Sequence, residues 1–340
     1  MTSVGWTWFA AAAAALTIGA AQAQTKLTVY TALEADQLKE YKQAFEKDNP
    51  GIEIQWVRDS TGIVTAKLLA EKNNPQADVV WGLAATSLML LDAEGMLAPY
   101  APAGLDKVSA KFRDPRPAPT WVGMDVWAAT ICYNTVEGGK KSLPKPASWA
   151  DLAKPVYRNS VTMPNPASSG TGFLMVSSWL QLMGEDAGWK FIDALHENVA
   201  AYTHSGSKPC RQAGAGEHPI GISFEYRANK TKAEGAPIEL VFPQEGLGWD
   251  MEATSILKTA KNMDAAKKLA DWAAGAKANE LYAKSFAVVA VPGVAKPLEH
   301  VPANYEQLLI KNDFDWAAKN RERILAEWTR RYDGKSEKKS

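Results

Sequence analysis

The sequence carries no excess of charge of either sign. Lys and Arg number 38, Asp and Glu also number 38, and the formal net charge is zero. A chain-wide basic surface for nucleic acid is therefore absent. The sequence also lacks a Gly-x-x-x-x-Gly-Lys-Ser/Thr phosphate loop and the His-Glu-x-x-His and Cys-x-x-Cys motifs of zinc sites. We therefore expect no nucleotide, metal or other cofactor.

Long hydrophobic runs are missing beyond the first residues. Residues 9–21 form an Ala-rich apolar run, and Ala21-Gln22-Ala23 matches a small-x-small cleavage site. No Lys or Arg precedes this run, which departs from the usual pattern, and no other stretch approaches the length of a membrane span. Residues 1–23 are predicted to be a cleaved secretory signal peptide, with a first transmembrane helix as the alternative, so the mature chain is expected in the periplasm.

Cysteine is scarce, with only Cys132 and Cys210 present. In an oxidising compartment an even number permits one disulfide, and two buried free thiols are the alternative. No nucleophile motif surrounds either residue, and no metal motif is present to activate a water. We therefore expect a binding protein and not an enzyme.

Short β-rich runs alternate with amphipathic helical segments along the chain. The expected strands and helices of the first half, in order, cover residues 27–30, 35–47, 52–57, 63–72, 78–81, 86–94 and 126–133. The second half repeats this rhythm over residues 161–163, 172–183, 187–195, 199–203, 220–224, 238–242, 253–257, 264–274, 279–286 and 305–332. Alternation of this kind predicts an α/β fold with mostly parallel, doubly wound sheets.

The 340 residues suffice for two domains. The chain is expected to leave one lobe near residue 130 and to return near residue 254, which makes a two-stranded hinge with a ligand cleft between two sheets. Lobe 1 is predicted to comprise residues 24–130 and 254–300, lobe 2 residues 131–253, and residues 301–340 a helical tail packed on the lobes. Ligands of open α/β sheets bind at the carboxyl ends of strands, so hinge closure around a solute is expected.

A polar loop, residues 165–172, precedes an apolar helix beginning at Phe173. A helix N-terminus offers free N–H groups and the positive end of the helix dipole, and glycines allow close approach of the backbone. The candidate contacts with a bound anion are Ser168, Ser169, Gly170 and Thr171. These residues favour a cradle for phosphate, phosphonate or carboxylate. Simple N-capping by Ser169 or Thr171 is the alternative.

Two shorter loops have a similar composition. Ser60 and Thr61 precede the helix at residues 63–72, and Ser205 and Ser207 follow the strand at residues 199–203. We expect them to assist in anion binding, although capping is a serious rival for both loops.

Acidic and aromatic residues stand at other predicted strand ends and at the first crossing. The candidates for binding an ammonium group are Glu34, Trp81, Asp125, Trp127, Glu225 and Tyr226. A carboxylate pairs with an ammonium, and an aromatic face adds cation–π attraction. The alternative for Glu34 and Glu225 is a solvated surface charge, and Trp81 fits the core as well as a cavity wall.

Several motifs resemble the extracellular solute-binding proteins that include the periplasmic ferric-binding proteins. They include Leu-Thr-Val-Tyr-Thr-Ala-Leu-Glu (27–34), Ala-Asp-Val-Val-Trp (77–81) and Pro-Asn-Pro-Ala-Ser-Ser-Gly-Thr-Gly (164–172). The resemblance covers nearly the whole mature chain. It implies a type II periplasmic binding protein fold, no enzymatic activity, a monomer, and delivery of a small solute to an ABC transporter permease in the inner membrane.

Within that family, the runs at residues 125–134 and 207–213 most resemble the binding proteins of 2-aminoethylphosphonate transporters. Ferric relatives bind iron through adjacent tyrosines, where this chain reads Phe224-Glu225-Tyr226, and a histidine frequent in their first loop is replaced by Glu34. The resemblance therefore implies 2-aminoethylphosphonate as the ligand. Iron, or another small phosphonate or phosphate, is the alternative.

Overall fold

The computed structural model describes residue 2 and residues 24–338. Apart from Thr2, the predicted signal peptide lies outside the described residues, as do the last two residues of the predicted tail. Within the part of the chain that is described, no helix combines the length and apolarity needed to cross a membrane.

The first lobe begins with three strand–helix units. They are β1 (Thr25–Thr31), α1 (Ala35–Asp48), β2 (Ile52–Arg58), α2 (Thr61–Ala70), β3 (Val79–Ala84) and α3 (Ala85–Ala93). β1 pairs in parallel with β2 on one side and β3 on the other. Helix α1 buries Tyr41 and Phe45, which recur at four-residue spacing on one helical face, and so covers the sheet with an apolar stripe.

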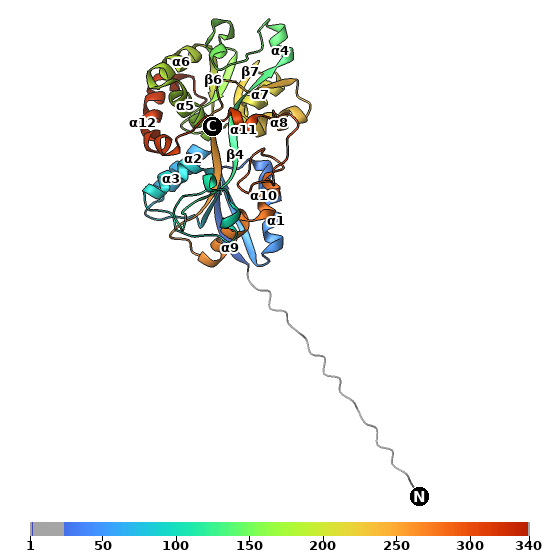
Figure 1. The fold of residues 1–340 in the computed structure, drawn as a ribbon, viewed down its shortest axis with the longest axis vertical. Coiled ribbons are helices and arrows are strands. Elements are labelled where there is room, and N and C mark those ends of the chain that lie inside the picture. Colours follow the sequence, from blue (N-terminus) through green and yellow to red (C-terminus); the bar gives the residue numbers. More distant parts are fainter. Residues whose placement is uncertain (1, 3–23, 339–340) are drawn as a thin grey trace.

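Strand β4 (Val122–Asn134) runs through both lobes, as Figure 1 shows. Residues 122–128 pair antiparallel with β9 (Trp249–Ile256), which in turn pairs with β3. Residues 129–134 pair with β7 (Ile220–Phe224) and β8 (Ile238–Val241). Because of these pairings, β4 belongs to both sheets and joins the lobes. All 13 of its residues are buried.

The second lobe is built on strands β5 to β8. Its remaining elements are α4 (Thr135–Lys140), β5 (Val161–Pro164), α5 (Gly170–Met183), α6 (Glu185–Asn198), β6 (Val199–Thr203), α7 (Lys208–Ala215) and α8 (Glu225–Ala233). β5 pairs in parallel with β6 and β7. Single 3₁₀ turns lie at Leu105–Lys107, Ala110–Phe112, Ala150–Ala153, Pro155–Tyr157 and Asp333–Lys335.

The C-terminal third passes from lobe 1 back to lobe 2. Helices α9 (Met263–Ala274) and α10 (Ala276–Tyr282) pack on lobe 1, and α11 (Tyr305–Leu308) lies near the junction (Figure 1). Helix α12 (Phe314–Tyr332) packs against α3 of lobe 1 and α5 of lobe 2, and its Arg331 contacts Asp193 of α6 at 3.1 Å. The single helix predicted over residues 305–332 is interrupted between the end of α11 and the start of α12. Asp313 caps α12 by accepting a hydrogen bond from the Trp316 N–H (2.8 Å).

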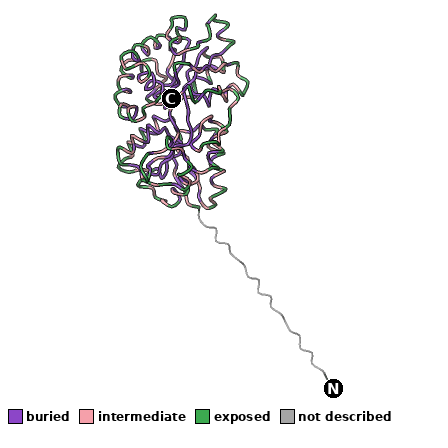
Figure 2. The backbone as a smooth tube through the Cα atoms, viewed as in Figure 1, coloured by how far each residue is buried: buried purple, intermediate pink, exposed green. Residues whose placement is uncertain are grey.

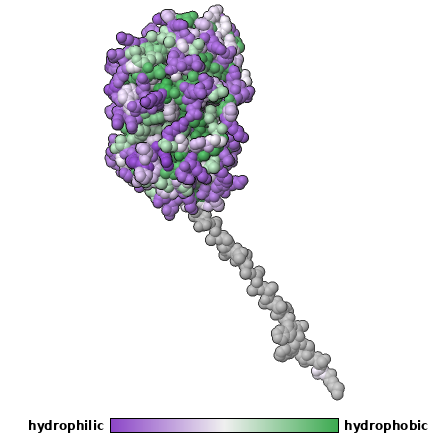
Figure 3. Space-filling model, in the orientation of Figure 1, coloured by the Kyte–Doolittle hydropathy of each residue, from purple (hydrophilic) through white to green (hydrophobic). Residues whose placement is uncertain are grey.

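Buried residues run continuously from one lobe to the other along the two crossing strands (Figure 2). The face in Figure 3 is largely hydrophilic, with hydrophobic residues in scattered patches. Inside, one large cluster of buried apolar side chains spans both lobes, from Leu27 of β1 to Ile222 of β7, and a second cluster that includes Val80 and Leu83 lies in lobe 1.

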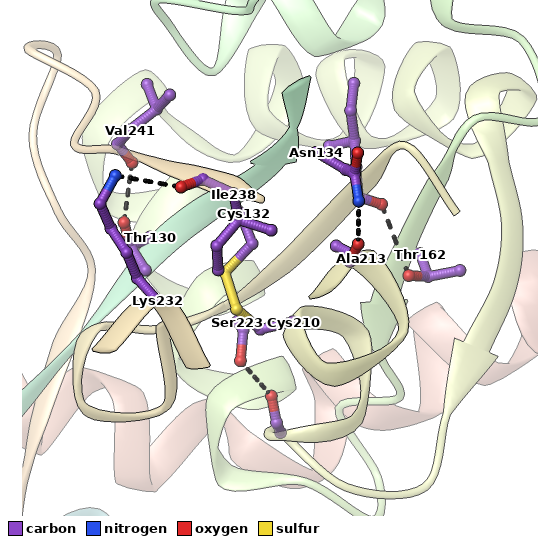
Figure 4. The surroundings of a disulfide bond; sticks show 12 residues. Thr130, Cys132, Asn134, Thr162, Cys210, Ala213, Ser223, Lys232, Ile238 and Val241 are labelled. Atoms are coloured by element: carbon purple, nitrogen blue, oxygen red, sulfur yellow. Dashed lines mark hydrogen bonds between the residues drawn. A yellow bond between two sulfur atoms is a disulfide. The ribbon is translucent and has the colours of Figure 1, made fainter. Parts of the chain in front are cut away.

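Cys132 on β4 and Cys210 on α7 form a disulfide, with Cα atoms 5.4 Å apart (Figure 4). The two residues are 78 positions apart in the sequence and both are fully buried. The bond ties helix α7, which follows a candidate ligand loop, to the strand that joins the lobes.

Replacing both cysteines by alanine is expected to lower the free energy of unfolding by about 2–4 kcal/mol, because the unfolded chain regains the freedom of a long closed loop. Urea unfolding of the oxidised protein and the double variant measures this. Reduced wild-type protein is the control and is expected to match the variant. A loss below about 0.5 kcal/mol in both would contradict a stabilising bond.

Candidate functional site

A cavity lies between the two lobes, at the edge of the crossing strands. The space in it that the centre of a water-sized sphere can reach is about 40 Å³. Its lining residues are Ala32, Glu34, Gln37, Arg58, Ser60, Thr61, Trp127, Ser169, Gly170, Thr171, Ser205, Gly206, Phe224, Glu252 and Phe286. Both lobes and both crossing strands contribute, so any bound solute is contacted from each lobe at once.

The N-terminus of α5 supplies one wall of the cavity. Ser169 is the N-cap residue of α5, and its Oγ accepts a hydrogen bond from the Gly172 N–H at 3.4 Å. Ser169 therefore caps the helix and also lines the cavity. Ser169 and Thr171 are buried. First-turn N–H groups of a helix have no intrahelical acceptor, which leaves them available to an anion.

The N-terminus of α2 faces that of α5 across the interlobe boundary. Ser60 is the N-cap of α2 but makes no side-chain cap hydrogen bond. The Gly62 N–H donates to the Ser168 carbonyl at 2.9 Å, a backbone hydrogen bond between the lobes. A Cβ at Gly170 would lie 2.6 Å from Thr61 Oγ1, so only glycine permits this approach.

The loop before α7 contributes a third helix start, with Ser205 and Gly206 on the cavity wall. Two neighbouring predicted residues do not line it. The Ser168 hydroxyl donates to the His204 carbonyl at 2.8 Å, and Ser207 is buried with its Oγ 3.4 Å from Ser205 Oγ. Both hydroxyls contact residues of the loop before α7, outside the lining of the cavity.

Arg58, the last residue of β2, is the only cationic side chain among the residues lining this cavity. Its Nε donates to the Leu33 carbonyl at 3.0 Å, and its Nη2 lies 3.7 Å from Glu34 Oε1. Together with three helix N-termini, the guanidinium makes this part of the cavity electropositive.

Glu34 lines the cavity, but its carboxylate is already paired. Arg227 Nη2 lies 2.7 Å and Arg211 Nη2 3.2 Å from Glu34 Oε2, and both arginines come from lobe 2. Arg227 is itself buried. The predicted role of Glu34 as an ammonium ligand is therefore not supported, because arginines occupy that carboxylate.

Tyr226 also joins the lobes and does not line the cavity. Its hydroxyl donates to Asp36 Oδ1 at 3.1 Å, and Asp36 also contacts Arg227 and Lys230. These contacts and the Glu34 ion pairs join the lobes along one side of the cavity. Together with the Gly62–Ser168 hydrogen bond, they hold the two lobes against each other, and we call this arrangement the closed form.

The remaining wall is aromatic and acidic. Trp127 on β4 is 5% exposed, and its ring packs edge-on against Phe224 with centroids 6.1 Å apart. Glu252, on β9, and Phe286, in the loop after α10, complete this wall. Oε2 of Glu252 is buried and makes no hydrogen bond within the described residues. An aromatic wall with a free carboxylate oxygen suits an organic cation.

Two more predicted carboxylates lie behind this wall, outside the lining. Asp125 is fully buried, and the Glu225 Oε2 accepts from the Ala128 N–H at 2.7 Å. Burial raises the pKa of Glu225 to about 8, although the Ala128 N–H opposes the shift. Burial likewise raises the pKa of Asp125 well above its usual value, and neighbouring Glu252 and Glu225 raise it further.

Trp81 belongs to the core of lobe 1. It is 0% exposed, stacks on Tyr41 with centroids 5.7 Å apart, and donates from Nε1 to the Tyr282 hydroxyl at 3.0 Å. Trp81 is therefore a core residue and does not line the cavity.

Sequence reasoning missed Arg58 and Glu252 as cavity residues. Arg58 directly follows the strand predicted at residues 52–57. Its position at the carboxyl end of that strand could have indicated a ligand-binding residue. Glu252 gave no such signal, because it lies within β9, whose first residues were not predicted to be a strand.

Residues 74–320 match the family described as bacterial extracellular solute-binding protein. An uncharacterized protein of Haemophilus influenzae is 33% identical over 77% of each chain. A probable ABC transporter periplasmic-binding protein of Sinorhizobium fredii, y4fP, is 27% identical over 79% of this chain and 75% of its own. The periplasmic binding protein AfuA of Actinobacillus pleuropneumoniae, solved with fructose-6-phosphate bound, superposes with a TM-score of 0.85. It is 29% identical and covers 92% of this chain and 99% of its own.

The fold and the family match define the class: the chain belongs to the bacterial extracellular solute-binding proteins. The predicted α/β, two-lobed, type II periplasmic binding protein fold is confirmed. Of the relatives named above, y4fP is a probable periplasmic-binding protein of an ABC transporter and AfuA is a periplasmic binding protein.

Gly62→Ala is expected to weaken solute binding by about tenfold or more, because its Cβ would lie 2.1 Å from the Ala167 carbonyl oxygen of the closed form. Helix α2 itself tolerates alanine, so the thermal midpoint of ligand-free protein is expected to stay the same or rise. Titration calorimetry and small-angle X-ray scattering measure the two effects.

The control is Gly139→Ala in α4, where an added Cβ meets nothing within 4 Å. If Gly62→Ala binds solute as tightly as this control and compacts normally, the Gly62–Ser168 contact is not part of closure.

Proposed function

We propose that this protein captures 2-aminoethylphosphonate in the interlobe cavity and delivers it to the membrane permease. The observation that carries the proposal is the pairing, within one small cavity, of an electropositive cradle with an aromatic and acidic wall. In a zwitterion with a phosphonate at one end and an ammonium at the other, the phosphonate would suit the cradle and the ammonium would suit the wall.

The phosphonate is assigned to the cradle. Ser169, Gly170 and Thr171 would contact it from lobe 2, and Ser60 and Thr61 from lobe 1. Arg58 adds a permanent positive charge, and Ser205 a further hydroxyl. Backbone N–H groups and hydroxyls at converging helix N-termini stabilise a dianion without full neutralisation by side chains.

The ammonium is assigned to the wall formed by Trp127, Phe224 and Glu252. A cation against aromatic faces gains about 0.5–2 kcal/mol, more when water is excluded. A plain phosphate would leave this carboxylate unused, which is why we favour an aminated solute.

Two other solute classes remain the competing candidates. A sugar phosphate is one, because AfuA was solved with fructose-6-phosphate. Ferric iron is the other, through the fold of the ferric-binding proteins. Against iron, the residues lining the cavity include no tyrosine, and Tyr226 donates its hydroxyl to Asp36.

Calorimetric titration of ligand-free mature protein with 2-aminoethylphosphonate, ethylphosphonate, phosphate, fructose 6-phosphate and Fe³⁺ tests the proposal. We expect one-to-one binding of 2-aminoethylphosphonate, with ethylphosphonate weaker by about tenfold or more because it lacks the charged hydrogen-bond partner. Preference for phosphate, fructose 6-phosphate or iron would keep the fold and overturn the choice of solute.

The double variant Ser169→Ala, Thr171→Val is expected to weaken 2-aminoethylphosphonate and ethylphosphonate alike, by about 10- to 100-fold, since it removes two hydroxyls from the shared cradle. The same titrations measure this. The control is Ser168→Ala, whose hydroxyl does not line the cavity. Unchanged affinity for both ligands in the double variant would refute the cradle.

A further inference from the structure

Asp125 of β4 and Glu252 of β9 are direct partners in the antiparallel register of the two crossing strands. Cross-strand partners hold their side chains on one face, with Cβ atoms about 4.5–5.5 Å apart. Neither oxygen of Asp125 makes a hydrogen bond within the described residues, nor does Oε2 of Glu252. Native structures rarely leave buried carboxylate oxygens without a partner.

On the basis of the proposed function, we propose that Glu252, supported by Asp125, binds the ammonium group of the solute and exchanges a proton for it. The carboxylic acid of Glu252 loses its proton to solvent, and the resulting carboxylate accepts hydrogen bonds from the ammonium, which keeps its own charge. Glu252 thereby selects aminated phosphonates over plain ones.

The groups around Glu252 explain why it holds a proton before the solute binds. The titratable side chains that act on it are the acids Glu34, Asp125, Glu225 and Asp250 and the phenols Tyr41 and Tyr282. The cations of this region are engaged with other acids: Arg58 and Arg227 contact Glu34, and the buried Arg321 acts on Asp250. Buried acids close to one another cannot all ionise, and the pKa values of Asp125, Glu225, Asp250 and Glu252 are all raised by their burial.

Burial, followed by repulsion from Glu34, Glu225 and Asp250, raises the pKa of Glu252 to about 8. At neutral pH the group is therefore largely protonated, and an incoming ammonium must shift it to the carboxylate. Affinity for 2-aminoethylphosphonate then rises as the pH increases towards about 8, and proton release fades above it.

The other acids near the cavity are poorer ammonium ligands. Glu34 is already bound by two arginines from lobe 2, and Glu225 accepts the Ala128 N–H and does not line the cavity. Glu252 alone combines a place on the wall with a free, buried oxygen.

The test compares wild type with Glu252→Gln in titrations of 2-aminoethylphosphonate and ethylphosphonate. We expect the variant to lose about 10- to 100-fold in affinity for the aminated ligand and less than about twofold for ethylphosphonate. The control is Glu239→Gln, at a half-exposed residue of β8 paired with Lys145, and it is expected to match wild type for both ligands. Glu34→Gln is expected to weaken both ligands equally, because it loosens closure.

Proton exchange is read from the same titrations in phosphate-free buffers of differing ionisation enthalpy. At pH 7 wild type is expected to release more protons than Glu252→Gln on binding the same ligand, by up to about one per site. The difference should vanish near pH 9.5, where Glu252 is already ionised.

Folding of the variant is checked by its thermal midpoint. Because the folded pKa of Glu252 exceeds that of an unfolded glutamate, the folded state binds an extra proton at this site, and the stability that this group contributes falls as the pH rises from about 5 through 8. Glu252→Gln removes that loss and is expected to melt no lower than wild type at pH 8.

Three outcomes overturn the inference. One is a folded Glu252→Gln that binds 2-aminoethylphosphonate within about twofold of wild type. The second is equal weakening of both ligands, and the third is equal proton release in variant and wild type. These outcomes leave the proposed function standing, whereas wild type that binds no 2-aminoethylphosphonate overturns both.

Discussion

The antiparallel pairing of β4 with β9 is the constraint on which the rest of the molecule depends. β4 contributes its first half to one sheet and its second half to the other, while β9 connects that pair to β3. The two lobes can therefore rotate about these strands without losing either sheet. Carboxylates on such buried strands carry a desolvation cost that their neighbours only partly offset, which makes their protonation responsive to what enters the cleft.

Closure is stabilised from two sides of the cavity by different physical means. Close approach of Gly62 to the Ala167–Ser168 backbone and of Gly170 to the Thr61 side chain brings two helix N-termini together, where their partial positive charges would repel without an anion between them. On the other side, Glu34 of lobe 1 meets Arg227 and Arg211 of lobe 2. An anionic group in the cradle would thus complete one half of the closed form, while the ion pairs supply the other half.

The sequence predicted the order and type of the main elements because apolar periodicity changes sharply between strands and helices at β1 to β3 and again at β5 to β7. It also predicted Ser169 and Thr171, since a polar loop before an apolar helix is a local signal. It could not predict the first residues of β9, because Asp250 and Glu252 interrupt the apolar pattern there. Nor could it predict that Arg227 pairs with Glu34, since the residues are 193 positions apart and come from different lobes.

The most direct test of the account is a crystal structure of the mature protein with 2-aminoethylphosphonate at pH 8. We predict the phosphonate oxygens within hydrogen-bond distance of Ser169 and Thr171, and the ligand nitrogen about 3 Å from a Glu252 oxygen, against Trp127. A ligand bound in the reverse orientation, or with its nitrogen directed to Glu34 and away from Glu252, would contradict the account.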